Sequence, residues 1–296
     1  MKNWTLALFI TFSLAAQSQV LKLGLITDCQ YCNCPYSEQW NNDYSKSPLR
    51  LKEAVNTLNS NDIDAVFHLG DFIDRDFNSF DIVGPIFNSI KAPHYHLLGN
   101  HDYSVSAELK PEVQHKLNMN SAYFMLNFEN WMIFVLDGTD VSLYKTNDSA
   151  QIKIADSIRI QYLNQGREQA MPWNGAIGEK QLNWLDSQLT EIDKTPKNAL
   201  ILCHFPIYPA GDANLWNDKE VITILEKHAS VKAFINGHHH PGNYAIKNGI
   251  HYLTLQGMVL SENKNSFAIG HLSNKEIAIK GFGREPNRVL KISTNQ

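Results

Sequence analysis

The sequence predicts a layered α/β protein, in which two mixed β-sheets form a sandwich flanked by helices. Two observations favour this fold class: five apolar runs of strand length each end in a group of polar residues, and segments with helical spacing lie between these runs. A third observation is that two other segments have the pattern of antiparallel hairpins. Strands that alternate with helices pair in parallel, so the added hairpins make the sheets mixed.

The five apolar runs have the length and composition of strands buried on both faces. They occupy residues 20–26, 64–69, 93–98, 199–202 and 231–235. The polar groups that follow them start at Asp28, Gly70, Gly99, Cys203 and Gly237. Because functional groups of α/β sheets gather outside the carboxyl ends of the strands, we expect these polar groups to share one edge of the fold.

Three segments have the spacing of amphipathic helices. Residues 47–59 and 178–192 each place leucines on one face, and Asp218 is expected to cap a third helix. The hairpin patterns predict two antiparallel strands within residues 123–137 and a run of antiparallel strands within residues 242–280.

The chain of 296 residues carries 26 lysines and arginines against 30 aspartates and glutamates, a net charge of −4. This balance excludes a broad basic surface for nucleic acid or an anionic membrane, so we expect neither as a partner. An apolar fraction of 43% is enough for a large core. No linker-like segment divides the chain, so residues 19–296 are interpreted as a single domain, and nothing indicates an oligomeric state.

The first 18 residues have the pattern of a signal peptide. A short charged start precedes an apolar run, and Ala16 and Ser18 stand at the positions of a cleavage site before Gln19. A buried helix or a membrane anchor is the alternative, but the run is shorter than the roughly 20 residues that a spanning helix needs. We therefore expect export to the periplasm or medium after cleavage near Ser18, without stable membrane insertion.

Three of the four cysteines, Cys29, Cys32 and Cys34, lie close together, whereas Cys203 is distant. This spacing is not that of a disulfide scaffold. A local disulfide, unpaired thiols and a zinc site of the type Cys-x-x-Cys-x-Cys stay open as interpretations, and the zinc site lacks a fourth ligand nearby in the sequence.

The polar groups after the strands supply aspartate, asparagine, glutamine and histidine side chains. These oxygen and nitrogen donors suit Mn²⁺, Fe or Zn²⁺ better than Ca²⁺ or Cu. Two such ions about 3.5–4 Å apart share a bridging carboxylate, and Asp71 is placed to supply it. The sequence therefore predicts a site for two divalent metal ions.

The ordered set resembles the calcineurin-like metallophosphoesterases, whose pattern is D-x-H, G-D-x-x-D, G-N-H-[DE], a lone His and G-H-x-H. It stands here as Asp28 to Gln30, Gly70 to Asp74, Gly99 to Asp102, His204, and Gly237 to His240. The resemblance covers nearly all of the chain after the predicted signal peptide. It implies the αββα fold of that family and hydrolysis of a small-molecule phosphate substrate.

The resemblance also implies roles for single residues. One metal ion would be held by Asp28, Gln30, Asp71 and His240, and the other by Asp71, Asn100, His204 and His238. His101 would be a catalytic imidazole that is not a ligand, with Asp74 accepting its second N–H. Asp102 is expected to fix a loop.

Gln30 departs from the family pattern, which usually has histidine at this position. An amide oxygen is a harder and weaker ligand than imidazole, so the exchange favours Mn²⁺ over Zn²⁺. The alternative is that Gln30 only forms hydrogen bonds nearby. The sequence Asp28-Cys29-Gln30-Tyr31 narrows the resemblance to the subgroup of manganese-dependent ADP-ribose/CDP-alcohol diphosphatases. Residues 40–46 lack most of the arginines and tyrosines that are usual in that subgroup.

Four residues are predicted to contact the substrate. Trp216, in the polar loop after His204, stacks on a nucleobase or else packs inside the loop. Lys46 and Arg284 are expected near a phosphate, with an exposed surface charge as the alternative for Arg284. His239 is expected to face solvent or substrate.

The predicted function is hydrolysis of phosphoanhydride or phosphodiester bonds in nucleoside diphosphate-linked substrates, with a nucleoside monophosphate as one product. One alternative is a phosphomonoesterase, or a phosphodiesterase acting on cyclic nucleotides or lipid headgroups. Another is a binding module that uses metal only for stability. The binding module is disfavoured, because His101 and Asp74 have no task in a purely structural metal site.

Overall fold

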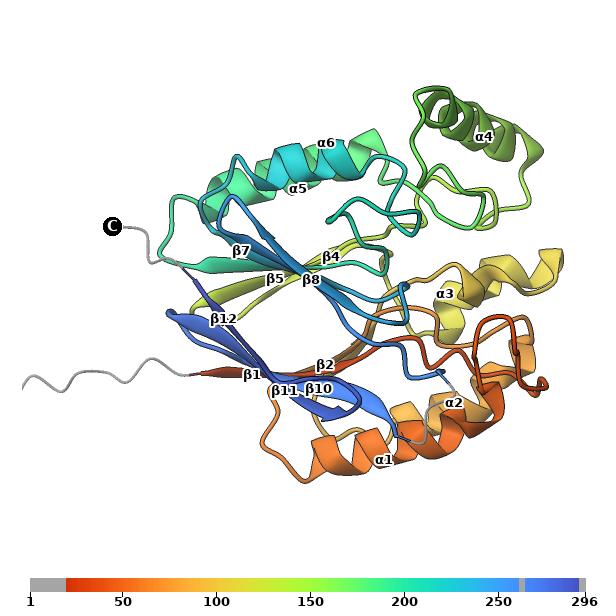
Figure 1. The fold of residues 1–296 in the computed structure, drawn as a ribbon, viewed down its shortest axis with the longest axis horizontal. Helices are drawn as coiled ribbons and strands as arrows, with labels where there is room; N and C mark the ends of the chain where they lie inside the picture. Colours follow the sequence, from red (N-terminus) through yellow and green to blue (C-terminus); the bar gives the residue numbers. More distant parts are fainter. Residues whose placement is uncertain (1–19, 261–263, 293–296) are drawn as a thin grey trace, which may run out of the picture.

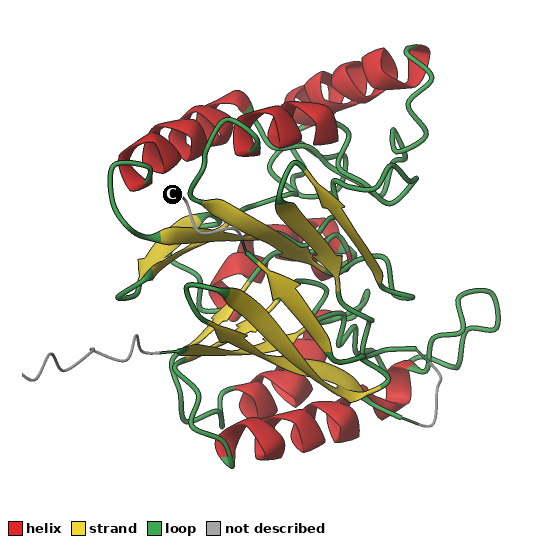
Figure 2. Ribbon diagram, turned by 60° about the vertical axis from the view of Figure 1, so that its left-hand side comes forward, coloured by secondary structure: helices red, strands yellow, loops and turns green. Residues whose placement is uncertain are grey.

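The computed structural model describes residues 20–260 and 264–292 (Figure 1). The predicted signal peptide lies outside these residues. The described strands form two six-stranded sheets that stack face to face, with helices on the outer faces (Figure 2). The predicted sandwich of two mixed sheets flanked by helices is confirmed.

The first sheet has the strand order β12-β11-β10-β1-β2-β3. Its strands are β1 (Leu21–Ile26), β2 (Ala65–His68), β3 (His94–His96), β10 (Ser266–Leu272), β11 (Glu276–Gly283) and β12 (Arg288–Lys291). β1 pairs in parallel with β2 and antiparallel with β10, so β1 lies inside the sheet.

The second sheet has the strand order β4-β5-β6-β7-β9-β8. Its strands are β4 (Phe124–Asn127), β5 (Trp131–Val135), β6 (Asn198–Leu202), β7 (Val231–Asn236), β8 (Asn243–Lys247) and β9 (Ile250–Thr254). The four inner strands are parallel, and the outer strands β4 and β8 are antiparallel to their neighbours.

The helices cover the outer face of each sheet. α1 (Ser47–Asn59) and α2 (Phe80–Phe87) lie against the first sheet, and α5 (Glu179–Ile192) and α6 (Asp218–Leu225) lie against the second. α3 (Val113–Lys116) and α4 (Ser149–Asn164) lie at the right of Figure 1, where α4 stands away from the sheets. Short 3-10 helices span Tyr44–Lys46, Phe77–Ser79, His101–Tyr103 and Ala107–Glu112.

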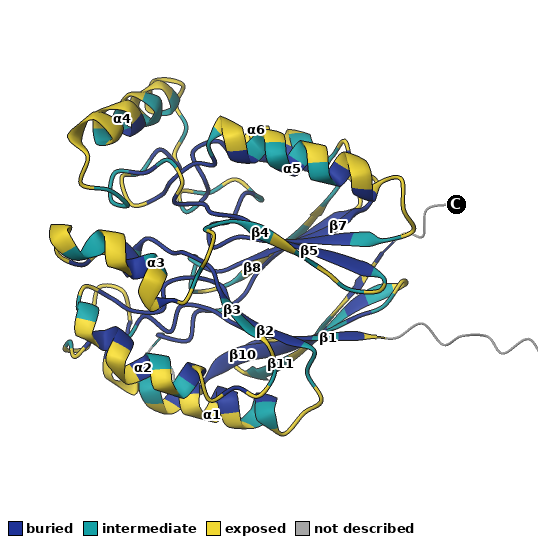
Figure 3. Ribbon diagram, turned by 180° about the vertical axis from the view of Figure 1, so that it is seen from behind, coloured by how far each residue is buried: buried dark blue, intermediate teal, exposed yellow. Residues whose placement is uncertain are grey.

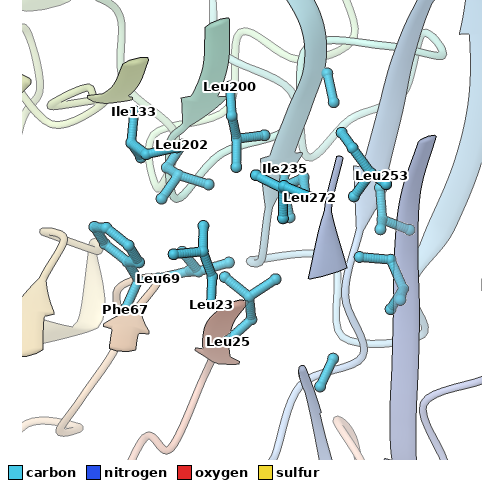
Figure 4. Close-up of a cluster of buried hydrophobic side chains, with 14 of the residues drawn as sticks. Leu23, Leu25, Phe67, Leu69, Ile133, Leu200, Leu202, Ile235, Leu253 and Leu272 are labelled. Atoms are coloured by element: carbon cyan, nitrogen blue, oxygen red, sulfur yellow. The ribbon is translucent and has the colours of Figure 1, made fainter. Parts of the chain in front are cut away.

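The central core fills the space between the two sheets. Leu23 and Leu25 of β1 meet Leu200 and Leu202 of β6 there, and all four side chains are fully buried (Figure 4). Because successive side chains of a strand point to opposite faces, Gly24 faces outward, toward Leu58 of α1. The central strands β2, β5 and β7 are buried on both faces, whereas the edge strands β4, β8 and β12 include exposed residues (Figure 3).

The helix predictions agree with the structure except at one boundary. α1 starts at Ser47 with Pro48 in its first turn, where a missing N–H costs no helical hydrogen bond. α5 begins directly after Gly178. Asp218, however, does not cap α6: it is the first residue of the helix, and Asn217 occupies the cap position.

The strand predictions are correct, and residues 242–280 form the expected antiparallel pairs, β8 with β9 and β10 with β11. The two pairs lie in different sheets, which was not predicted: β8 and β9 join the second sheet, whereas β10 and β11 join the first. β9 also pairs in parallel with β7. The chain thus crosses between the sheets after β9, which alternation of apolar residues within each strand does not indicate.

Of the interpretations left open for the cysteines, the structure shows a local disulfide. Cys32 and Cys34 form a disulfide, and Cys29 and Cys203 are buried thiols. The three-cysteine zinc site is therefore contradicted. Among the described residues, no helix has the length and apolar content needed to cross a membrane.

Candidate active site

The predicted polar groups follow the carboxyl ends of β1, β2, β3, β6 and β7. Several of these residues have an unusual backbone: φ is +50° at Asp28, +46° at Gln30, +55° at Asp71 and +65° at His238. Residues other than glycine rarely adopt this left-handed conformation, and where they do, the surrounding structure holds them in it. The site is therefore held by strained turns at strand ends.

Backbone hydrogen bonds join these turns to one another. The Gln30 N–H donates to the carbonyl of Asp71 at 2.8 Å, and the Asp28 N–H donates to that of Gly70 at 3.2 Å. On the other side, the Val259 N–H donates to the carbonyl of Asp28 at 3.0 Å. The turn after β1 is thus fixed between two other loops.

Asp102 fixes the loops after β2 and β3, as predicted. Its buried carboxylate accepts four backbone N–H groups: those of Asp71 at 3.2 Å, Phe72 at 2.8 Å, Ile73 at 3.3 Å and Gly99 at 2.9 Å. A carboxylate occupied in this way has little capacity left for a metal ion, so its function is to hold the loop of Asp71 in place.

Two glycines let these loops approach closely. A Cβ atom on Gly99 would lie 2.1 Å from Oδ1 of Asp71, and one on Gly237 would lie 1.9 Å from Oγ1 of Thr27 and 2.7 Å from Oδ2 of Asp28. Any side chain at either position would displace a carboxylate of the site.

The side chains predicted as ligands gather around Asp71. One donor atom each from Asp71, His204 and His238 lie within 4.8 Å of one another. Nε2 of His204 is 3.1 Å from Oδ2 of Asp71, and Nε2 of His240 is 3.5 Å from Oδ1 of Asp28. Side chains far apart in the sequence therefore converge on one small volume.

Four donor atoms of this cluster are buried, and among the described residues they have no polar partner other than the 3.1 Å contact between Asp71 and His204. They are Oε1 of Gln30, Oδ2 of Asp71, Oδ1 of Asn100 and Nε2 of His204. Leaving a buried polar atom unpaired costs about 1–3 kcal/mol, so one such atom in a native fold requires an explanation. Divalent cations bound beside these atoms would satisfy them, and the donor set thus fits divalent metal ions.

The orientation of His204 supports this fit. Its Nδ1 lies 2.8 Å from the carbonyl oxygen of Leu69, which only accepts, so Nδ1 carries a proton. Nε2 is then the nitrogen that faces Asp71. Burial alone would lower the pKa of His204, but the charge of Asp71 raises it to about 9. A proton and a metal ion would therefore compete for binding between Nε2 of His204 and Oδ2 of Asp71.

His101 and Asp74 lie together beside the cluster. Nδ1 of His101 is 3.1 Å from Oδ1 of Asp74, and the His101 backbone N–H donates to Oδ1 of Asp71 at 2.7 Å. Burial would lower the pKa of His101, but the carboxylates of Asp71 and Asp74 raise it to about 9. About 32% of its side chain is exposed, so a proton on its other ring nitrogen can reach a bound molecule.

The comparisons with known proteins agree with this geometry. Residues 21–242 match the family model of calcineurin-like phosphoesterases. The chain belongs to the calcineurin-like phosphoesterase family. As a calcineurin-like phosphoesterase it is a metallophosphoesterase, a hydrolase that acts on phosphorus-containing bonds.

Relatives of this calcineurin-like phosphoesterase include manganese-dependent ADP-ribose/CDP-alcohol diphosphatases. The mouse protein of that name is 27% identical, with 93% of this chain and 94% of the mouse protein covered. The Arabidopsis thaliana protein is 29% identical, with 91% and 96% covered. A crystal structure of a dimetal phosphatase from Danio rerio superimposes with a TM-score of 0.84 at 25% identity, covering 93% of this chain and 99% of that one. The dimetal relative implies two metal ions.

The prediction that Trp216 stacks on a nucleobase is wrong. Its side chain is fully buried against Ala155 and Ala176, and its indole N–H donates to the carbonyl of Met171 at 2.9 Å. Because no ring face is exposed, Trp216 supports the loop, as in the alternative interpretation. A polar sequence around an aromatic residue did not reveal this burial.

Arg284 and Lys46, which were predicted to lie near a phosphate, both contact other residues of the chain. The guanidinium of Arg284 donates to the carbonyls of Lys264 and Gly257 and to the side chain of Gln256, so it holds loops together. Lys46 forms an ion pair of 2.7 Å with Asp43 and remains half exposed.

His239 is partly exposed, as predicted, and lines a cavity of about 150 Å³. Tyr208, Asp212 and Thr254 are among the other residues of its wall. Since His239 stands between His238 and His240, this cavity lies next to the cluster of donor atoms.

Sequence reasoning missed one residue of the site. Asn174 is fully buried, and its Oδ1 lies 2.9 Å from Nε2 of His238. An Asn-Gly pair such as Asn174-Gly175 ordinarily indicates a turn, and no pattern in the sequence relates it to a histidine so far along the chain.

Proposed function

We propose that this phosphoesterase uses two divalent metal ions, Mn²⁺ by preference, to cleave the phosphoanhydride bond of nucleoside diphosphate-linked compounds. ADP-ribose and CDP-alcohols are the expected substrates, and a nucleoside monophosphate is one product. The convergence of unpartnered donor atoms around Asp71 carries the metal part of this proposal. The names of the mouse and Arabidopsis thaliana relatives support the substrate class.

The ligand sets follow those expected from the sequence. Asp28, Gln30, Asp71 and His240 would hold one ion, and Asp71, Asn100, His204 and His238 the other. When bound, two such ions polarise phosphoryl oxygens and activate a water molecule. Gln30 would offer Oε1, because its amide nitrogen lies 3.5 Å from Oδ2 of Asp74 and Oε1 is the atom without a partner.

His101 would supply the proton that the leaving oxygen takes up. Asp74 holds its Nδ1 and stabilises the protonated ring, which leaves Nε2 to donate. A phosphate that leaves as a stabilised anion needs this proton less than an alcohol does. A diphosphate substrate therefore places a smaller demand on His101 than an alkyl phosphate monoester.

A panel of substrates tests the reaction. Protein loaded with Mn²⁺ is incubated with ADP-ribose, CDP-choline, a cyclic nucleotide, a glycerophosphodiester and p-nitrophenyl phosphate, and products are separated by chromatography. We expect AMP and CMP from the first two, at the highest kcat/KM. Faster cleavage of the monoester or of either diester would contradict the substrate class, and no turnover of any compound would contradict the enzyme itself.

Asp71→Ala is the matched variant for the metal part. Removing the bridging carboxylate should lower the amount of bound Mn²⁺ and abolish turnover. Gln30→His should retain activity and shift the preference from Mn²⁺ toward Zn²⁺, because imidazole is the softer and stronger ligand. Two tightly bound ions per chain in Asp71→Ala would show that the ligand assignment is wrong.

We also propose that the protein is exported, with Gln19 or a residue close to it as the new N-terminus. Expression of the full chain and N-terminal sequencing of the extracytoplasmic protein test this. Recovery of that protein with Met1 still present would argue for an anchor.

A further inference from the structure

The buried side chain of Asn174 makes three contacts, one at each polar position. Its Oδ1 lies 2.9 Å from Nε2 of His238, and its amide nitrogen lies 3.0 Å from the carbonyl of Gln169 and 2.6 Å from the carbonyl of Asp212. The three partners come from three separate segments of the chain. Asn174 is fully buried, so water does not compete for these contacts.

These partners determine which way the amide points. Carbonyl oxygens only accept, so the two that face the amide of Asn174 require its NH₂ group. The opposite orientation would place Oδ1 against two carbonyl oxygens and the NH₂ group against His238. The amide oxygen of Asn174 therefore faces the imidazole, and there it can only accept.

An acceptor at Nε2 determines the tautomer of His238. A neutral imidazole carries one proton, and a hydrogen bond to Oδ1 of Asn174 places that proton on Nε2. Nδ1 then keeps its lone pair. His204 has the opposite arrangement, because its Nδ1 bonds to the carbonyl of Leu69 and its Nε2 faces Asp71.

We propose that Asn174 is a positioning residue, which holds His238 as the Nε2–H tautomer so that Nδ1 is the nitrogen offered to a metal ion. This inference rests on the proposed dinuclear centre. Partners of this kind orient a ligand imidazole and raise its basicity, and their removal typically costs 10–100-fold in metal affinity. Asn174 itself would touch neither metal nor substrate.

The same contacts relate His238 to the neighbouring cavity. Asp212, whose carbonyl accepts from Asn174, lies in the wall of the cavity beside His239. The amide thus fixes the ring of one predicted ligand and the backbone of a wall residue together. Its loss should affect the binding of metal before the fold as a whole.

The first experiment reads the tautomer directly in the metal-free wild-type protein. Long-range ¹H–¹⁵N correlation spectra of ¹⁵N-histidine-labelled protein distinguish a protonated from an unprotonated ring nitrogen, and the signal of His238 is assigned by its absence in His238→Asn. We expect the Nε2–H form for His238. The Nδ1–H form would overturn the proposal whatever the protein catalyses.

The second experiment compares three variants by titration with Mn²⁺ alone, with the free ion counted by electron paramagnetic resonance. Asn174→Ala removes the acceptor and should weaken one of two binding steps 10–100-fold. Asn174→Asp keeps an acceptor oxygen for Nε2 of His238 but places its second oxygen against the carbonyls of Gln169 and Asp212, so it should recover only part of that loss. Asn217→Ala is the matched control: the side chain of Asn217 forms two hydrogen bonds with the backbone of Ile177 in the same loop, and neither involves a predicted ligand.

The outcomes separate a positioning role from a structural one. Weaker binding in Asn174→Ala alone, together with a mixture of His238 tautomers in its spectra, supports the proposal. Equal weakening in Asn217→Ala, or wild-type binding in Asn174→Ala, overturns it. A wild-type protein that binds no Mn²⁺ contradicts the proposed function instead, and the spectra of the metal-free protein still decide the tautomer.

Discussion

Asp71 contacts three neighbouring residues at once. Its Oδ1 accepts the backbone N–H of His101, its Oδ2 lies 3.1 Å from Nε2 of His204, and its own carbonyl accepts the N–H of Gln30. The imidazoles of His204 and His101 lower the pKa of this carboxyl group, although burial alone would raise it. The carboxylate thus stays charged in a buried place, which is what a bridging ligand requires.

His101→Ala separates catalysis from metal binding. We expect the Mn²⁺ content to remain at the wild-type level and the rate to fall by about 10²–10⁴, the range for a positioned acid or base. The loss should be smallest for substrates whose leaving group needs no proton. Metal analysis and steady-state kinetics measure both, and a loss of metal would instead identify His101 as a ligand.

Gly99→Ala tests the close approach at the loop after β3. The new methyl group would lie 2.1 Å from Oδ1 of Asp71, so the carboxylate has to move and metal affinity should fall. Gly84→Ala in α2 is the control, because no atom lies within 4 Å of its added Cβ. Calorimetric titration with Mn²⁺ compares the two, and equal affinities would show that the contact is not limiting.

Single residues differ in how well the sequence predicts them. Asp102 could be assigned to a loop, because it follows a motif whose other members account for the ligands. Trp216 could not be placed, since the burial of an aromatic ring depends on which other segments reach it, here those of Ala155 and Met171. The role of Asn174 in the site was not predicted for the same reason, because its partner His238 is distant in the sequence.

At the scale of elements, the loops after β2 and β3 behave as one unit. The carboxyl group of Asp102 accepts N–H groups from both loops, and burial together with the charge of Asp71 raises its pKa to about 7. The backbone donors pull this pKa down but do not outweigh burial. Asp102 thus supplies most of the hydrogen bonds that join the two loops, and Oδ1 of Asp71 adds one more by accepting the His101 N–H.

Asp102→Ala should destabilise the fold and the site together. Four backbone N–H groups lose their acceptor, and each unsatisfied donor costs about 1–3 kcal/mol, so we expect a loss of at least about 2 kcal/mol. Asp81→Ala is the control, since its exposed ion pair with Lys116 contributes about 1 kcal/mol at most. Denaturant unfolding compares both, and similar losses would argue against the proposed unit.

The elements themselves were predictable where one face is buried. α1 packs one apolar face on the first sheet, so its spacing indicates a helix. α4 has two pairs of isoleucines, at 152 and 154 and at 158 and 160. The spacing of two within each pair is typical of a strand, and only Ala155 of this helix is buried. The one residue whose type indicates a helix here is Asp148, whose carboxylate caps the helix by accepting the N–H of Ala150.

The whole molecule also encloses titratable groups away from the site. His68 and His96 are buried between the first sheet and its helices, where they pack against the rings of Phe72 and Phe87. Neither ring nitrogen of His68 has a hydrogen-bond partner among the described residues. Burial lowers the pKa of His68 to about 3 and that of His96 well below its usual value.

Acid should therefore destabilise the protein through these histidines. The unfolded chain takes up protons near pH 6.5 whereas the folded chain does not, so stability is full above this pH and falls toward pH 3. Each such group contributes up to about 1.4 kcal/mol per pH unit. His68→Leu should flatten the profile, whereas His115→Gln, at an exposed position, should not. Urea unfolding between pH 7 and 5 measures it, and parallel profiles would exclude His68 as a cause.

The position of β1 inside the first sheet affects how the chain folds during its synthesis on the ribosome. One of its two neighbours, β10, begins only at Ser266, and β9 and His240 also come late in the chain. While the ribosome is still making these segments, β1 exposes an unpaired edge, which is a template for aggregation. The nascent chain is thus expected to depend on chaperones at least until β10 has been synthesised, because β1 lacks one of its neighbours before then.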